Sequence, residues 1–112
     1  MPFCTAWERD IHFAKHGHKF GVTDATQYER MADDFTFGPR GAGTQECLRP
    51  GGRDRVRFAD MTRWLAVSRV LPAPECLRTF YRVRQATVAR HGGSANYFAY
   101  ECGRIMDGGG RR

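Results

Sequence analysis

A stretch rich in glycine and proline, from residue 36 to residue 55, divides the chain into two parts of different character. Glycine and proline at this density predict a loop, with one short edge strand near Gln45–Leu48. Before the stretch, apolar residues recur at helical spacing, and after it they alternate with polar residues at the period of a strand. The sequence therefore predicts helices first and a small sheet second.

Two helices are predicted in the first part. One runs from about Thr5 to His16 and ends at Gly17, because glycine adopts the left-handed conformation without penalty. Its spacing predicts that Trp7, Ile11 and Ala14 face the core. Residues 17–21 then form a turn that Phe20 anchors. The second helix runs from about Asp24 to Phe35 after a Thr23 N-cap, with an apolar stripe of Tyr28, Met31, Ala32 and Phe35.

Three further strands are predicted after a hairpin turn at Gly51-Gly52. In the first of them, Val56 and Phe58 alternate with arginines and are expected to face the core. The next strand spans residues 64–70, and the last spans residues 76–83. One face of the last strand carries Leu77, Thr79, Tyr81 and Val83, and the other carries Arg78, Phe80 and Arg82.

These elements predict an α+β fold in a single domain, residues 1–112. Two N-terminal helices, about residues 5–35, pack on a roughly four-stranded antiparallel sheet, about residues 44–84. The tail, residues 85–112, contains a short helix that Ser94 caps and that carries Tyr97, Phe98 and Tyr100. Residues 107–112 have nothing to pack and are expected to be disordered.

Composition excludes several classes of protein. No apolar run approaches the roughly 20 residues that a membrane span needs, and acidic residues precede any apolar segment of the kind a signal peptide has. The four cysteines, Cys4, Cys47, Cys76 and Cys102, form no C-x-x-C pair. Two disulfides are allowed by the even count, but the dispersed spacing favours mostly reduced, partly buried thiols.

The segment HFAKHGHKFG, His12 to Gly21, contains three histidines and the only two lysines of the chain. In a helix, His12 and His16 share a face, since they are four residues apart. Titrating groups beside fixed positive charge suit proton transfer next to an anion. The alternatives are a solvated basic helix end, or a metal site on the i, i+4 histidine pair. For a metal site, no cysteine or carboxylate completes a known zinc motif, so no metal or cofactor is expected.

The positive charge is concentrated in the middle of the chain. Residues 47–84 contain nine arginines and only three acidic residues, and the net charge of the whole chain is +6. Arginine binds phosphate through two parallel hydrogen bonds, so this segment predicts a polyphosphate partner, most simply nucleic acid. An arginine-rich composition that reflects genomic base content is the alternative. The residues expected to contact RNA are Arg55, Arg63, Arg78, Arg82 and Arg84.

Taken together, these residue types suit RNA cleavage by transesterification, in which the ribose 2′-hydroxyl attacks the adjacent phosphorus without a metal. One histidine takes the 2′-proton and another protonates the departing 5′-oxygen. Lysine or arginine holds the developing negative charge, and threonine or tyrosine hydroxyls orient the phosphate. The candidates are His12, Lys15 and His16 near the first helix end, arginines of the sheet, and Thr79 and Tyr81 on the last strand.

Three segments resemble bacterial polymorphic-toxin nuclease domains of the barnase–EndoU–colicin–RelE class, found at the C-termini of contact-dependent or secretion-system effectors. They are HFAKHGHKFGVTDATQYERMADDF, then RVRFADMTRWLAV with RTFY, and HGGSANYF. The resemblance covers most of residues 12–98 in the same order. Family members often have an Asp-Gly turn before the last strand, where this chain has PAPECL at residues 72–77.

The resemblance implies a metal-independent endoribonuclease with a catalytic set of His12, Lys15, His16, Arg57, Thr79 and Tyr81. It implies an RNA substrate, tRNA among the candidates, and an acidic immunity protein as partner. It also implies a monomer, without membrane association, that acts in the cytoplasm of a target bacterium after delivery by a larger effector or secretion system. Two other classes of function remain open from the residues. One is a non-catalytic basic module that binds RNA or DNA, and the other is an interaction domain for an acidic protein.

Overall fold

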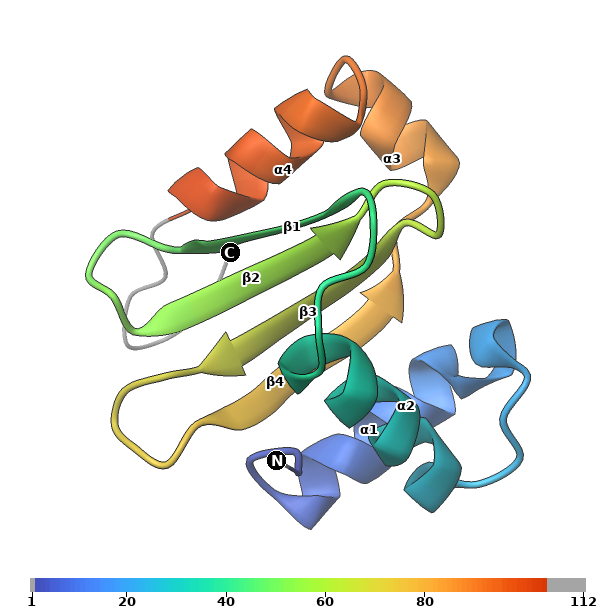
Figure 1. Cartoon of the computed structure of the whole chain (residues 1–112). Helices are drawn as coiled ribbons and strands as arrows, with labels where there is room; N and C mark the ends of the chain where they lie inside the picture. The colour runs from blue at the N-terminus through green and yellow to red at the C-terminus, as the bar shows by residue number, and fades with distance from the viewer. Residues whose placement is uncertain (1, 105–112) are drawn as a thin grey trace.

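Four antiparallel strands form the centre of the fold (Figure 1), in a computed structural model that describes residues 2–104. The strands are β1 (Thr44–Leu48), β2 (Asp54–Ala59), β3 (Trp64–Arg69) and β4 (Cys76–Arg82), and they lie in chain order across the sheet. The predicted turn joins β1 to β2, with Gly51 at φ 95° and Gly52 at φ 71°, values that favour glycine. The predicted antiparallel meander is confirmed.

The helices are α1 (Ala6–His16), the 3₁₀-helix η1 (Gly17–Phe20), α2 (Ala25–Phe37), α3 (Gln85–Arg90) and α4 (Ser94–Gly103). The predicted α+β class, with two N-terminal helices and a short C-terminal helix, is confirmed. The six residues of α3 form a helix that was not predicted, since so short a segment shows no periodicity. None of the described helices is both long enough and apolar enough to cross a membrane.

The start of α1 is capped by Thr5, but the inward side of the helix is not the predicted one. The Thr5 hydroxyl accepts a hydrogen bond from the Glu8 amide at 3.0 Å. Trp7 is 72% exposed, and no residue of α1 is fully buried. The helix contacts the edge strand β4, and it turns His12 and His16 toward that strand. The prediction that Trp7, Ile11 and Ala14 face the core is wrong, because the covered side of α1 is largely polar.

The predicted apolar stripe of α2 is confirmed. Tyr28 and Ala32 are 0% exposed, and Met31 and Phe35 pack partly against them. The N-cap is Asp24, whose carboxylate accepts from the Gln27 amide at 2.8 Å, one residue after the predicted position. The helix ends at Phe37, two residues later than expected.

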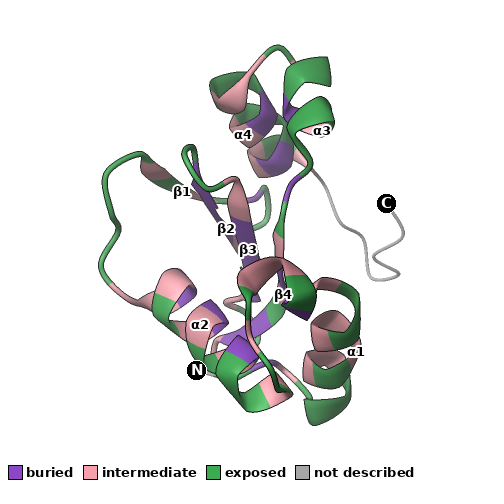
Figure 2. Cartoon of the chain, turned by 90° about the vertical axis from the view of Figure 1, so that its right-hand side faces the viewer, coloured by how far each residue is buried: buried purple, intermediate pink, exposed green. Residues whose placement is uncertain are grey.

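A buried core lies on each face of the sheet (Figure 2), although no residue of β1 is itself buried. On one face, α2 contacts β3 and β4, and the α2-side core consists of Phe3, Tyr28, Ala32, Ala66, Leu77 and Phe80. On the other face, α4 contacts β1 and β2, and the α4-side core consists of Val56, Phe58, Leu65, Val67, Val83, Val88 and Tyr97. The predicted inward orientation of Val56 and Phe58 is confirmed.

A bulge in β4 changes the faces predicted for that strand. Thr79 pairs with Val67, but Leu77 pairs with Ser68, so Arg78 is the extra residue. Leu77 therefore points into the α2-side core, while Thr79 and Tyr81 share the α4-side face. The prediction that all of these residues lie on one face is wrong, because a bulge inverts the alternation beyond it.

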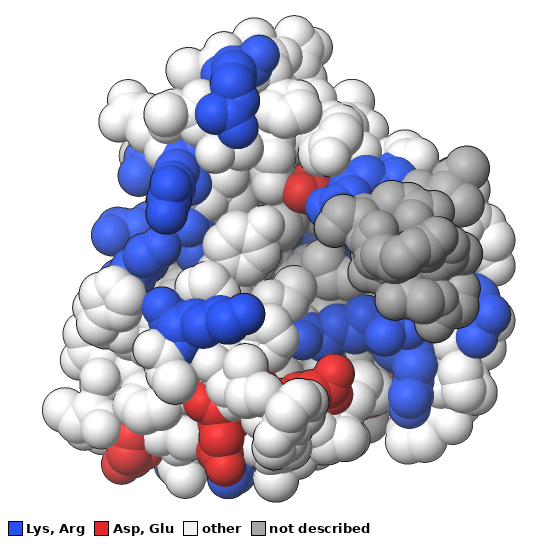
Figure 3. Space-filling view, turned by 180° about the vertical axis from the view of Figure 1, so that it is seen from behind, with Lys and Arg blue, Asp and Glu red and all other residues white. Residues whose placement is uncertain are grey.

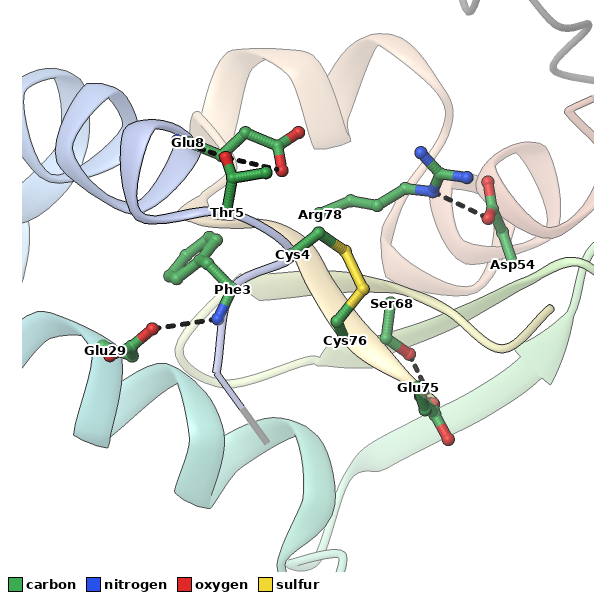
Figure 4. The surroundings of a disulfide bond; sticks show 10 residues. All are labelled: Phe3, Cys4, Thr5, Glu8, Glu29, Asp54, Ser68, Glu75, Cys76 and Arg78. Atoms are coloured by element: carbon green, nitrogen blue, oxygen red, sulfur yellow. Dashed lines mark hydrogen bonds and ion pairs between the residues drawn. A yellow bond between two sulfur atoms is a disulfide. The ribbon is translucent and has the colours of Figure 1, made fainter. Parts of the chain in front are cut away.

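All four cysteines form disulfides, so the expectation of mostly reduced thiols is wrong. Cys4 pairs with Cys76 across 72 residues, and Cys47 pairs with Cys102 across 55 residues. Figure 4 shows the first bond tying the segment before α1 to the start of β4. Phe3 beside it forms a parallel bridge with Leu77. Dispersed cysteines give no local signal of their pairing, because only the tertiary fold brings them together. The predicted disorder at residues 107–112 lies outside the described residues.

Candidate active site

The structure brings four of the predicted catalytic residues together between α1 and β4. Nδ1 of His12 lies 3.4 Å from Oγ1 of Thr79. The His16 ring stacks on the Tyr81 ring, with 5.2 Å between the centroids, and the two histidine rings are 5.9 Å apart. The i, i+4 spacing places both imidazoles on one side of α1, and the bulge in β4 turns both hydroxyl residues toward them. Residues 67 positions apart therefore share one site.

Both histidines are held toward their neutral forms. Burial lowers the pKa of His16 from 6.5 to about 4, and His12, Lys19 and Lys15 add repulsion in the same direction. Nδ1 of His16 is buried and makes no hydrogen bond within residues 2–104, so no partner there stabilises the imidazolium. Burial also lowers the pKa of His12, to which Lys15 contributes repulsion and Glu8 a smaller opposing attraction. Burial and nearby positive charge both destabilise the protonated imidazolium, so each lowers the pKa of a histidine.

The shift at His16 is the larger one, and this difference distinguishes the two rings. In an acid–base pair, the group with the lower pKa is available to accept a proton, and its neighbour is available to donate one. His16 therefore suits a base, and His12 suits an acid. The sequence alone left this assignment open.

Lys15 lies beside the pair on the exposed side of α1. Its ammonium group acts on the pKa of both histidines, so it is close enough to act on an anion bound there. Figure 3 shows the side of the molecule opposite to the view of Figure 1, where Lys and Arg side chains surround an uncharged and partly hollowed area.

Arg57 is not part of this group. It pairs with Ala66, which pairs with Phe80, so it lies on the α2-side face, opposite to Thr79 and Tyr81. Its guanidinium donates to the carbonyls of Phe35 and Gly38 and to the Glu46 carboxylate, at 2.9, 2.7 and 2.9 Å. The side chain holds the end of α2 on the sheet. The alternation gave its face correctly but did not show that a helix covers that face.

The predicted RNA-binding arginines are divided among different environments. Arg55 is paired with Glu46 and Glu75 on the α2-side face, and Arg63 donates to the Val83 carbonyl. Arg78, the bulge residue, bonds Asp54 at 2.8 Å with 42% of its side chain exposed. Arg82 and Arg84 are exposed. Arg78 comes directly before Thr79 and Arg82 directly after Tyr81, so two arginines of β4 flank the site residues in sequence.

Three buried residues outside the predicted site, Tyr97, Glu101 and Arg49, bond one another near the core cluster against which Tyr81 packs. Tyr97 of α4 packs in the same core cluster, and its hydroxyl donates to the buried Glu101 carboxylate at 2.6 Å. Arg49 donates to the same carboxylate at 2.7 Å. The i, i+4 spacing of Tyr97 and Glu101 in the sequence could have indicated that the two side chains meet on α4, but it does not indicate which strand they pack against. Burial raises the pKa of the Tyr81 phenol.

No group of three or more His, Cys, Asp or Glu side chains within residues 2–104 is arranged to hold a metal ion. Comparison with protein-family models and with curated protein sequences found no match for this chain. The arrangement of its own side chains is therefore the basis for a functional conclusion.

Proposed function

We propose that the chain is an endoribonuclease that cleaves RNA by transesterification to a 2′,3′-cyclic phosphate without a metal ion. The observation that supports this most directly is the adjacent histidine pair with unequal pKa values, in contact with Thr79 and Tyr81. A base, an acid and positive charge in one place are what this reaction requires.

In the proposed mechanism, neutral His16 takes the proton from the 2′-hydroxyl as its oxygen forms a bond to phosphorus. Protonated His12 gives its proton to the 5′-oxygen as the bond from phosphorus to that oxygen breaks. Lys15 attracts the non-bridging oxygens, and the Thr79 hydroxyl beside His12 orients the phosphate. Tyr81 contacts His16 with its ring, which we regard as its main contribution, in place of the hydroxyl role expected from the sequence.

The resemblance of the histidine and arginine segments to polymorphic-toxin nucleases supports a wider proposal. The domain would be a toxin that acts in the cytoplasm of a target bacterium and that an acidic immunity protein neutralises. The positive net charge of +6 suits both an RNA substrate and an acidic inhibitor.

Incubation with total RNA and with an oligonucleotide that contains all four bases, in the presence of EDTA, tests the proposal. We expect cleavage of the RNA but not of the DNA of the same sequence, with 2′,3′-cyclic phosphate ends identified by mass spectrometry. Loss of activity in EDTA would contradict the metal-free mechanism. Binding of RNA without cleavage would instead indicate a non-catalytic nucleic-acid-binding module.

The pH dependence of kcat/KM tests the assignment of the two histidines. Activity needs His16 neutral, hence a pH above about 4, and His12 protonated, hence a pH below a value that is itself lowered from 6.5. We therefore expect a bell-shaped profile with its maximum between these limits and a fall toward neutral pH. A rate that rises through pH 7 to a plateau would show that protonated His12 is not the acid.

A further inference from the structure

An open pocket of about 430 Å³ lies between α2 and the first residue of β3. Its apolar wall consists of three partly buried side chains, Met31, Phe35 and Trp64. The Phe35 and Trp64 rings meet edge to face, with 5.7 Å between their centroids. The rim consists of three exposed polar residues of α2, Gln27, Arg30 and Asp34. A pocket of this size with apolar walls and a few polar groups is typical of a small-ligand site.

The polar groups of the rim are available to a ligand. Arg30 and Asp34 are one helical turn apart, so both side chains lie on the same side of α2. Within residues 2–104, neither side chain forms a hydrogen bond or an ion pair. The side-chain carbonyl of Gln27 accepts from the amide and from the hydroxyl of Thr23, each at 2.9 Å, which leaves its NH₂ group to donate. The rim therefore offers one carboxylate as acceptor and two side chains as donors.

These groups match guanine among the four bases of RNA. Guanine carries the donors N1–H and N2–H₂ side by side, where one carboxylate accepts from both, and it carries the acceptors O6 and N7, to which a guanidinium donates. Adenine places the acceptor N1 beside its amino group, so a lone pair would face the carboxylate. Cytosine does the same with N3, and uracil has a single N–H between two carbonyl oxygens. Guanine is therefore the base that meets the Asp34 carboxylate with two adjacent donors.

The pocket is close to the proposed active site in the fold. Arg82 directly follows Tyr81 on β4, is exposed, and is the cross-strand partner of Trp64. Its side chain therefore lies on the same face of the sheet as the pocket. The 3₁₀-helix η1, which begins directly after His16, contacts the pocket wall through Phe20, whose ring centroid is 5.4 Å from that of Trp64. A base unstacked from an RNA strand is held in such a place by an aromatic ring and by hydrogen bonds to its edge.

We propose that this pocket binds a guanine base stacked against Trp64. The Asp34 carboxylate accepts from N1–H and N2–H₂ of the base, and Arg30 donates to O6 and N7. Binding of the base does not depend on cleavage. The further role of the pocket, to select a guanosine of the RNA near the cleaved bond, rests on the proposed function.

Tryptophan fluorescence tests the inference with mononucleotides that contain no bond to cleave. The chain has two tryptophans, and Trp7 is 72% exposed, so Trp7→Phe leaves Trp64 as the reporter. We expect guanosine 5′-monophosphate to quench this fluorescence and adenosine 5′-monophosphate to bind at least about 10-fold more weakly. Inosine 5′-monophosphate, which lacks the N2 amine, should lie between them. Equal affinities for the guanine and adenine nucleotides, or no quenching by the guanine nucleotide, would overturn the inference.

Asp34→Asn, made in the Trp7→Phe protein, tests the assigned acceptor. The exposed side chain can change without loss of packing, and the amide no longer accepts from both donors of guanine. Binding of guanosine 5′-monophosphate should weaken by about 10- to 100-fold, with loss of the preference over adenine. The matched control is Asp10→Asn, which removes an exposed carboxylate from α1 and should leave the affinity unchanged. Unchanged binding in Asp34→Asn would contradict the proposal.

The same proteins separate this inference from the proposed function. Selective binding of the guanine nucleotide by a protein that cleaves no RNA would retain the pocket and reject the nuclease. Cleavage of RNA by a protein that does not prefer the guanine nucleotide would retain the nuclease and reject the pocket. If both hold, cleavage of an oligonucleotide with all four bases should favour positions near guanosine, and Asp34→Asn should remove this preference.

Discussion

His16→Ala is expected to lower the rate of RNA cleavage by about 10²–10⁴-fold, the range for removal of one acid–base group. With its pKa near 4, His16 is neutral across the working range and is ready to accept the 2′-proton. The ring lies partly exposed between His12 and Tyr81, so its removal should affect chemistry more than folding. Single-turnover cleavage near the pH optimum gives the measurement.

The matched control is His18→Ala. His18 is an exposed histidine on η1, two residues from His16, and its loss should leave the rate close to that of the wild type. Addition of imidazole to the buffer should restore part of the His16→Ala activity, because a free base can occupy the space left by the ring. Equal rates in the wild type and His16→Ala would rule out His16 as the base.

His12→Ala should cost a similar factor, and the double variant should cost little more than either alone. An acid and a base that act in one concerted step depend on each other, so their losses do not add. Additive losses would indicate that the two rings act in separate steps.

Much of the fold could be predicted because its signals are local. The alternation around Val56 and Phe58 gave the strand and the side that it buries, and the paired glycines at 51 and 52 gave the hairpin. The stripe on α2 gave Tyr28 and Ala32 correctly. Each of these patterns depends on backbone sterics and burial within a few residues.

The site could be predicted only in part, because its geometry depends on contacts between distant segments. The spacing of His12 and His16 showed that they share a side of the helix, but treating them as polar led to the wrong inward face for α1. The bulge at Arg78 then decided which residues of β4 meet them. A regular strand would have kept Leu77 on the same face as Tyr81.

Arg57 and Tyr97 both show that residue type alone does not predict which groups a side chain contacts in the fold. Arg57 had the right residue type for a phosphate contact, but the end of α2 covers it. Tyr97 looked like an ordinary aromatic residue of a short helix, but the fold buries it in the core cluster against which Tyr81 packs. Residue type indicates what a side chain can do, and only the packing of helices on the sheet decides what it meets.

Reduction of the two disulfides is expected to remove most of the stability of the fold. In the chain-entropy account, a bond that closes 72 or 55 residues stabilises the native state by about 4 kcal/mol. The two contributions together fall within the range of roughly 5–15 kcal/mol that is typical of the whole free energy of unfolding of a domain. Urea unfolding with and without reductant, followed by circular dichroism, measures the loss as a lower midpoint.

The two bonds can be separated with paired substitutions. Cys47→Ala with Cys102→Ala should lower the free energy of unfolding, and Cys4→Ala with Cys76→Ala should do so by a similar amount. The second pair should also lower cleavage under conditions where the protein is still folded, because Cys4 lies just before α1 and Cys76 begins β4. The bond between them fixes the helix that carries His12 and His16 against the strand that carries Thr79 and Tyr81.

The result bears directly on where the protein can act. Disulfides form and persist in oxidising compartments, while cytosolic thiols are kept reduced. A nuclease that works in a target cytoplasm would therefore have to act before its bonds are reduced, or remain folded without them. If reductant lowers both the urea midpoint and the rate of cleavage, activity should decay with time in a reducing buffer. An unchanged midpoint, with all four thiols shown by alkylation to be free, would mean that packing alone holds α1 and α4 on the sheet.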